Sequence, residues 1–207
     1  MKVTHPTAGF RDRLAEQRWD DHRYYHHSLI NQSLHFVSAS AFICAYIVVF
    51  HDPALASLLG WLVAMLSRQS GHFFFEPKDF DEANGVSHAY KEEVKVGYNL
   101  ARKWVFMALW ALCPIPLLID PTLFGTLEPY EGFAGFARSL GILWLALAAA
   151  GLLFRTLQLC FTRDPWTGVT WAVKIITDPF HDIKLYHKAP LRLLKGERID
   201  ASIARAG

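Results

Sequence analysis

Two clusters of polar residues, each beside an apolar stretch, carry side chains that bind metals. The first contains His27, Asn31 and His35, spaced four residues apart directly before an apolar run. On one helix this spacing places all three side chains on the same face. The second contains His72 and Glu76, also four residues apart, so an imidazole and a carboxylate can converge. Neutral imidazole with carboxylate is the ligand set of non-haem Fe(II) sites that keep positions open, so the pattern predicts an iron site.

The residue spacing leaves the exact ligands open. His26 and His27 are adjacent and point about 100° apart on a helix, so both cannot easily bind one metal. The spacing favours His27, whereas His26 forms its own pair with His22. The histidines at the two helix mouths could instead hydrogen-bond across the hairpin without a metal. The chain has three cysteines, Cys44, Cys113 and Cys160, all in or at the edge of apolar runs, which disfavours structural zinc and a disulfide framework.

Several further polar residues are candidates for the site. Asn31 and Glu76 could ligate the metal directly or orient the imidazoles as neighbouring groups. His88 and Glu92 form another pair four residues apart and are a candidate second ligand set. Arg102 and Lys103 precede the third apolar stretch. They are expected to bind a fatty-acid carboxylate, although a role as helix-end anchors fits equally well. His181 and His187 lie in a polar C-terminal segment, and a contribution to the metal site is open.

Four apolar stretches must position these clusters: residues 34–50, 54–67, 104–119 and 140–154. They predict an all-α integral membrane bundle of about four membrane helices in two hairpins, with interfacial helices. Each stretch is shorter than the roughly 20 residues that span a bilayer comfortably. A soluble helical bundle and shallow re-entrant hairpins are therefore alternatives. We expect a single domain over residues 1–207, with the metal site in 20–120 and the second hairpin and a cytoplasmic segment in 121–207.

The distribution of charge indicates a membrane topology. The chain has 207 residues, is 52% hydrophobic and carries a formal net charge of +2, which gives no basis for nucleic-acid binding. If the four stretches span, Arg138 is the one residue among 21 Lys and Arg on the far side. The positive-inside rule then places both termini in the cytoplasm, in a bacterial inner membrane or the endoplasmic reticulum. The polar first thirty or so residues show no secretory signal peptide.

The two motifs together resemble the 2-hydroxy fatty acid dioxygenase family of yeast phytosphingosine degradation, which has bacterial relatives. The resemblance covers roughly residues 20–120 and rests on Tyr25-His26-His27-x-x-x-Asn31-x-x-x-His35 and Gly71-His72-x-x-Phe75-Glu76. It implies a membrane dioxygenase of fatty acid alpha-oxidation that uses Fe2+ and molecular oxygen to shorten a 2-hydroxy fatty acid by one carbon. The residues that it implies for the site are His27, His35 and His72, with Asn31 and Glu76 alongside.

The chain departs from that family at two places. It reads Phe36-Val37-Ser38-Ala39 where the family usually has a proline, and Arg68 where the family usually has a glutamine. Two other classes therefore stay open. One is a different metal-dependent membrane hydroxylase or desaturase, although the HxxHH box of those enzymes is absent from the sequence. The other is a non-enzymatic membrane scaffold protein whose histidines only cap helices.

The distribution of basic residues predicts on which side of the membrane two reporter domains would lie. Reporter domains fused at the C-terminus and inserted within residues 122–137 are expected on opposite sides of the membrane, with the C-terminus cytoplasmic. Reporter activity and protease protection in intact cells measure this. Extraction of the protein into buffer without detergent would contradict the membrane topology.

Overall fold

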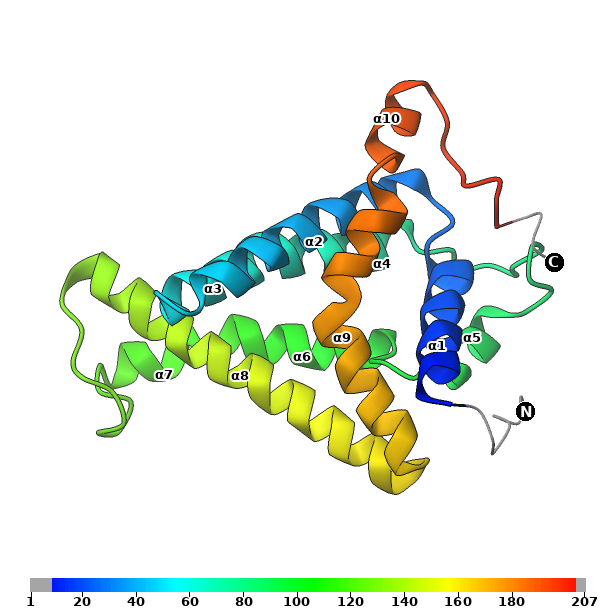
Figure 1. Cartoon of the computed structure of the whole chain (residues 1–207). Helices are drawn as coiled ribbons and strands as arrows, with labels where there is room; N and C mark the ends of the chain where they lie inside the picture. Colours follow the sequence, from blue (N-terminus) through cyan, green and yellow to red (C-terminus); the bar gives the residue numbers. More distant parts are fainter. Residues whose placement is uncertain (1–8, 204–207) are drawn as a thin grey trace.

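The computed structural model describes residues 9–203, and within this range all regular structure is helical (Figure 1). The two β-bridges, Ser28 with Ile199 and Asp81 with Val86, are isolated. This confirms the predicted all-α class. The helices are α1 (Phe10–Tyr25), α2 (Leu29–Val48), α3 (Pro53–Leu59), the π-helical turn η1 (Gly60–Met65), α4 (Leu66–Phe75), α5 (His88–Val94), α6 (Leu100–Leu112), α7 (Pro114–Ile119), α8 (Gly132–Thr162), α9 (Pro165–Tyr186) and α10 (Ala189–Leu194).

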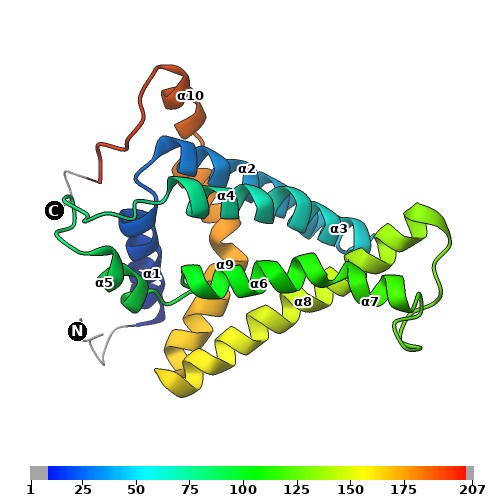
Figure 2. The ribbon, with the colours of Figure 1, turned by 180° about the vertical axis from the view of Figure 1, so that it is seen from behind.

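The first predicted hairpin is present, formed by α2 and the continuous helix α3–η1–α4 (Figures 1 and 2). The α2 helix begins where the Ser28 hydroxyl accepts a hydrogen bond from the Ile30 N–H. The α3 helix begins with Pro53 in its first turn, and the Asp52 carboxylate accepts from the Leu55 N–H. The second helix runs on well past residue 67 as α4, which carries the second polar cluster alongside the first turns of α2.

The third and fourth apolar stretches form the longest apolar helical segments. Residues Leu100–Ile119, which comprise α6 and α7, and Gly132–Thr162, which is α8, are long and apolar enough to cross a membrane by length and composition. The helix α8 extends well beyond the predicted 140–154 at both ends. Four membrane helices were expected. Within the described residues, these two segments are long and apolar enough to cross a membrane. Large apolar side chains on α6 and α7, such as Trp104, Leu109 and Ile119, face outward.

Close packing of α3 against α8 closes the apolar end of the bundle. A Cβ atom on Gly141 would lie 2.6 Å from the Ala54 carbonyl oxygen, so the two backbones touch at this crossing. Nearby, the indole of Trp61 donates to the Trp144 carbonyl at 3.0 Å, and Trp144 donates to the Trp110 carbonyl at 3.1 Å. The Trp110 ring stacks on both Trp61 and Trp144, so the three indoles pack this part of the core tightly.

Buried ion pairs hold the opposite end together, where α9 crosses α1 and α4 (Figure 1). Three cations and three carboxylates alternate there: Lys174 binds Asp21 and Asp178, and Arg68 binds Asp182 at 2.9 Å. Arg18 adds a bond to Asp178. Burial of charge is costly unless each charge is paired. The paired network therefore fixes α9, from the C-terminal half of the chain, against the helices that carry the two polar clusters.

The crossing at Gly141 predicts a specific weakness. Gly141→Ala is expected to lower the unfolding temperature in detergent, because its Cβ meets backbone that cannot move aside; overpacking of this kind costs roughly 1–3 kcal/mol. Gly60→Ala is the matched control in a buried helical position. Its Cβ meets only the Phe42 ring at 3.8 Å, so the structure should tolerate it. Equal thermal shifts for the two variants would contradict the backbone contact at Gly141.

Candidate metal centre

Three buried imidazoles from three different segments converge at the polar end of the first hairpin. His26 comes from the turn between α1 and α2, His35 from α2 and His72 from α4, and one ligand nitrogen of each lies within 4.8 Å of the others. The Nε2 atoms of His26 and His35 are 3.1 Å apart. Two nitrogens that each lie about 2.1 Å from one ion are about 3 Å apart, so this spacing fits a shared metal. The ring centroids of His35 and His72 are 4.9 Å apart.

Burial keeps these imidazoles in the form that binds metals. The pKa of His26 is held well below its usual value by burial and then by the neighbouring His35. Burial also lowers the pKa of His72 well below its usual value, and the positive charge of Lys103 acts in the same direction. Both rings are therefore neutral at physiological pH and can offer a nitrogen lone pair without first losing a proton.

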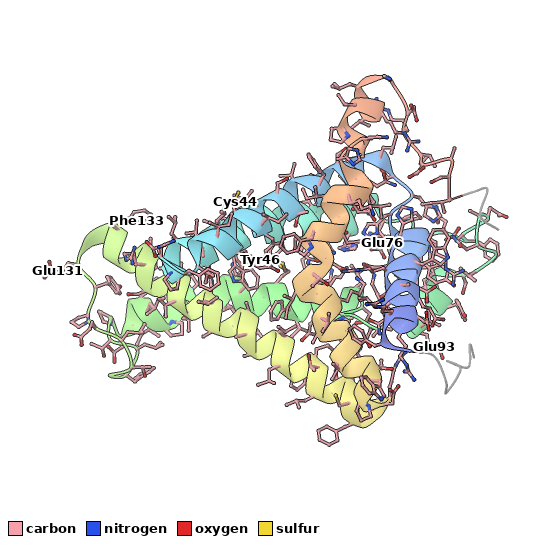
Figure 3. All side chains as sticks on the ribbon, in the orientation of Figure 1. Cys44, Tyr46, Glu76, Glu93, Glu131 and Phe133 are labelled. Carbon is pink, nitrogen blue, oxygen red and sulfur yellow. The ribbon has the colours of Figure 1, made fainter. Side chains whose placement is uncertain are left out.

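Glu76 orients His72 in the way that carboxylates orient metal-binding histidines. Its Oε2 accepts a hydrogen bond from the Nδ1 of His72 at 2.7 Å, which leaves Nε2 directed at the other rings. Lys95 holds the other carboxylate oxygen at 3.5 Å, and its ammonium also lies over the Tyr25 ring. Glu76 lies at the end of the molecule that carries α1 (Figure 3). Of the two roles left open for Glu76, this geometry fits the orienting one.

Asn31 and Gly71 set how closely α2 and α4 approach. The Asn31 amide donates to the Tyr25 carbonyl at 2.8 Å, which ties α2 to the end of α1. Its Oδ1 lies against Gly71, where a Cβ atom would be only 2.1 Å away. Asn31 is fully buried beside the triad, and its Oδ1 has no hydrogen-bond partner in the described structure. Glycine at position 71 is thus what allows the two polar clusters to meet.

The C-terminal segment at Asp200, called the strap below, is hydrogen-bonded to the turn that carries His26. The Gln32 amide donates both to the His26 carbonyl at 2.9 Å and to the Asp200 carboxylate at 2.8 Å. The Asp200 backbone N–H donates to the His27 carbonyl at 2.8 Å. Burial alone would raise the pKa of Asp200, but hydrogen bonds from Gln32 and Ser202 lower it to about 2, so the carboxylate stays charged. The strap therefore clamps the backbone next to the triad.

The helix α9 supplies residues to this site that the sequence patterns did not indicate. The Tyr186 ring lies 5.6 Å from His26 and 6.0 Å from His35, and its hydroxyl pairs with Nδ1 of His22 at 3.1 Å. Asp182 approaches Nδ1 of His35 at 3.7 Å. A cavity of about 10 Å³ adjoins His26, His22, Asp182 and Tyr186, which is about enough for one water molecule. His181 also lines this small cavity, whereas the Nδ1 of His187 lies 3.0 Å from the Lys184 carbonyl, and neither histidine belongs to the triad.

The structure does not bring His27 or His88 into the triad. The Nε2 of His27 lies 2.5 Å from the Arg23 carbonyl and 3.4 Å from Asp81, on the other side of the turn. The spacing argument assumed a helix through residue 27, but α1 ends at Tyr25 and α2 begins at Leu29. Ser28, the N-cap of α2, was the signal for this turn. His88 opens α5 and lies outside the triad.

A cavity of about 500 Å³ begins at His72 and continues between the helices. Near His72 its wall is charged, with Arg68, Lys95 and Lys103. Beyond these residues, apolar side chains from α2, α3, η1, α6, α8 and α9 line it: Phe42, Val49, Trp61, Met65, Phe106, Leu145 and Ile176. Tyr46, seen in Figure 3, reaches from α2 to the Ile176 carbonyl at 3.0 Å. The cavity is thus charged at the triad and apolar away from it.

The two basic residues predicted to bind substrate differ in their positions. Lys103 is 9% exposed and lines the cavity, and within residues 9–203 its ammonium group makes no hydrogen bond or ion pair. Arg102 is exposed on α6 and does not line the cavity. A charge on the unpaired Lys103 side chain is costly in this buried position, so the site favours an anionic ligand that would pair with it.

Comparison with known proteins gave no match: no protein-family model, curated protein or solved structure matches this chain. The function is therefore inferred from the residues and geometry of the site.

The adjacent histidines offer a matched test of the triad. His26→Ala is expected to lose bound metal, because it removes one of three converging nitrogens, whereas His27→Ala should retain it. Metal analysis by mass spectrometry on protein purified in detergent measures the stoichiometry, with circular dichroism as the control for folding. Metal loss in His27→Ala together with retention in His26→Ala would contradict the assignment.

Proposed function

We propose that this protein is an Fe2+-dependent membrane dioxygenase that shortens 2-hydroxy fatty acids by one carbon. The observation that carries the proposal is the position of His72, which belongs both to the imidazole triad and to the wall of the cavity. A carboxylate held at the charged end of that cavity lies beside the metal position, and its chain extends into the apolar part. The family resemblance of the two motifs points to the same substrate.

The donor set fits iron. The triad offers three neutral nitrogen donors and no thiolate, and three protein ligands leave coordination positions open. When bound by His26, His35 and His72, the metal would supply the redox chemistry with molecular oxygen. Burial of all three rings keeps bulk water from the site.

The reaction balances without an external reductant. The bond between C1 and C2 of the 2-hydroxy acid breaks, C1 leaves as carbon dioxide, and C2 becomes the new carboxyl carbon. Molecular oxygen accepts the four electrons that the two carbons lose, and one water molecule is formed. The protein therefore needs only to bind the acid, orient it and hold the metal ligands in place.

The residues of the chain divide this work among them. Lys103, with Lys95 nearby, neutralises the substrate carboxylate at the charged end of the cavity. Glu76 holds the orientation of His72, and Asn31 holds the backbone before His26. The apolar cavity wall binds the acyl chain through burial of its methylenes. No proton transfer by these residues is required for substrate binding.

The membrane setting supports a lipid substrate. We propose that all four apolar stretches are embedded in the bilayer, with both described chain ends and the triad at the cytoplasmic face. Two of the stretches are long and apolar enough to span, and the Lys and Arg residues other than Arg138 lie in the segments that this topology assigns to the cytoplasmic side. A fatty-acid head group naturally lies at such an interface, while its chain lies among apolar helices.

A non-enzymatic scaffold is the second candidate. The 3.1 Å separation of the His26 and His35 nitrogens also fits a hydrogen bond between two neutral rings, which would need no metal. In that case the histidines only hold the hairpin together. Metal-free protein that is fully folded and inactive on lipids would favour this alternative.

Neighbouring basic residues provide a sharp test of the proposed activity. Protein loaded anaerobically with Fe2+ and 2-hydroxypalmitate is expected to release the odd-chain acid when oxygen is admitted. Lys103→Met should raise KM by about tenfold or more, the loss expected for one charge-assisted hydrogen bond, and should leave the metal content unchanged. Arg102→Met, exposed and outside the cavity, should behave like the wild type. Folded, iron-loaded protein that leaves every 2-hydroxy acid intact would reject the activity.

A further inference from the structure

We propose that Ala56 on α3 and Gly60 at the start of η1 set the longest acyl chain that the cavity accepts. This inference rests on the proposed function, because it names the residues of the same cavity that select among substrates. Both residues line the cavity, both are buried, and they lie four residues apart on one continuous helix. They therefore occupy the same face at two levels, one helical turn apart.

The cavity has the length of a long acyl chain. Its charged end lies at His72, which packs against His35, and its far end on α2 is Val49. The fourteen residues from His35 to Val49 correspond to about 21 Å of helix. The hydrocarbon core of one bilayer leaflet is about 15 Å thick, half of the whole. The cavity can thus hold one extended long chain with its head group at the triad.

Small residues create the far part of this space. Ala45, Ala56, Ser57 and Gly60 line it from the first hairpin, opposite Ala148 of α8. Larger side chains, such as Phe42, Trp61 and Phe106, form the walls around them. A larger side chain at one of the alanines or at Gly60 would project into the cavity. Side-chain size at these positions therefore limits the length of acyl chain that the cavity can hold.

Helices α3 and α8 touch one another just beyond Ala56. Ala54, two residues earlier, has its carbonyl oxygen 2.6 Å from the position of a Gly141 Cβ atom, so α3 and α8 leave no space between them there. A chain that enters from His72 therefore passes Gly60 first, reaches Ala56 next and then meets the crossing. A larger residue at Gly60 should therefore exclude shorter chains than a larger residue at Ala56.

The local structure at Gly60 permits a larger side chain to point into the cavity. Its added Cβ would meet the Phe42 ring at 3.8 Å, which is ordinary van der Waals contact. Gly60 also begins the π-helical turn, a feature often found at functional sites. A leucine there would fill the cavity at the level of Phe42, one turn closer to the triad than a leucine at Ala56.

The test uses the full chain in detergent, loaded with Fe2+ and kept anaerobic. Binding of 2-hydroxylauric, 2-hydroxypalmitic and 2-hydroxystearic acid is measured by isothermal titration calorimetry, and product formation after admission of oxygen is measured in parallel. The variants are Ala56→Leu and Gly60→Leu. Ala150→Leu is the control, because Ala150 is exposed on α8 and does not line the cavity.

Ala56→Leu is expected to weaken binding of 2-hydroxystearic acid and to preserve binding of the other two acids. Gly60→Leu should also weaken binding of 2-hydroxypalmitic acid, and it should preserve binding of 2-hydroxylauric acid. Each methylene that can no longer be buried should weaken binding about fourfold. Ala150→Leu should match the wild type at every length. If a leucine variant loses its metal, Ala56→Val and Gly60→Ala test the same order in smaller steps.

An unchanged chain-length profile in metal-loaded Gly60→Leu, or an equal loss at all three lengths, would overturn the inference. Failure of the proposed function looks different. Wild-type protein that binds the three acids with a length preference, but yields no shortened product, rejects the dioxygenase activity and still allows the binding series to decide the role of Ala56 and Gly60. Wild-type protein that binds none of the acids rejects both.

Discussion

The close approach of α2 and α4 at Gly71 is the contact on which the rest of the site depends. A Cβ atom there would lie 2.1 Å from the Asn31 amide oxygen and 3.5 Å from the His35 ring, so any other residue would displace the Asn31 side chain or push the helices apart. The same Asn31 holds the Tyr25 carbonyl and, through it, the turn that carries His26. One glycine therefore controls the separation of imidazoles that come from three segments.

Charge is distributed unevenly along the bundle, and this distribution gives the cavity its two ends. Near the triad, the cations of the α1–α4–α9 network are matched by carboxylates, so they hold the helices together rather than attract a ligand. Lys103 is different, because its buried ammonium faces the cavity without such a match. Toward the α3–α8 crossing, the walls are apolar. An amphipathic molecule with one anionic end fits both parts at once.

The sequence predicted the helices better than the ligands. Apolar runs with Ser28 and Asp52–Pro53 at their starts gave the hairpin, because capping and periodicity are local properties. His35 and His72 were identified as a facing pair because both lie at the mouths of its helices. The structure brings His26, and not the favoured His27, to His35 and His72, because the helical spacing was extended across a turn. The lengths of the third and fourth helices were underestimated, because polar and glycine-rich ends continued as helix.

By itself, the sequence determined the all-α class, the first hairpin, the sorting of basic residues and the meeting of His35 with His72. These follow from hydrophobic periodicity, helix caps and charge, which act between residues close in the chain. The tertiary structure alone decided that His26 turns inward, that α9 brings Tyr186 and Asp182 to the triad and that Lys103 faces a cavity. Those features depend on contacts between residues more than a hundred positions apart, and on backbone approach at single glycines, which no local pattern encodes.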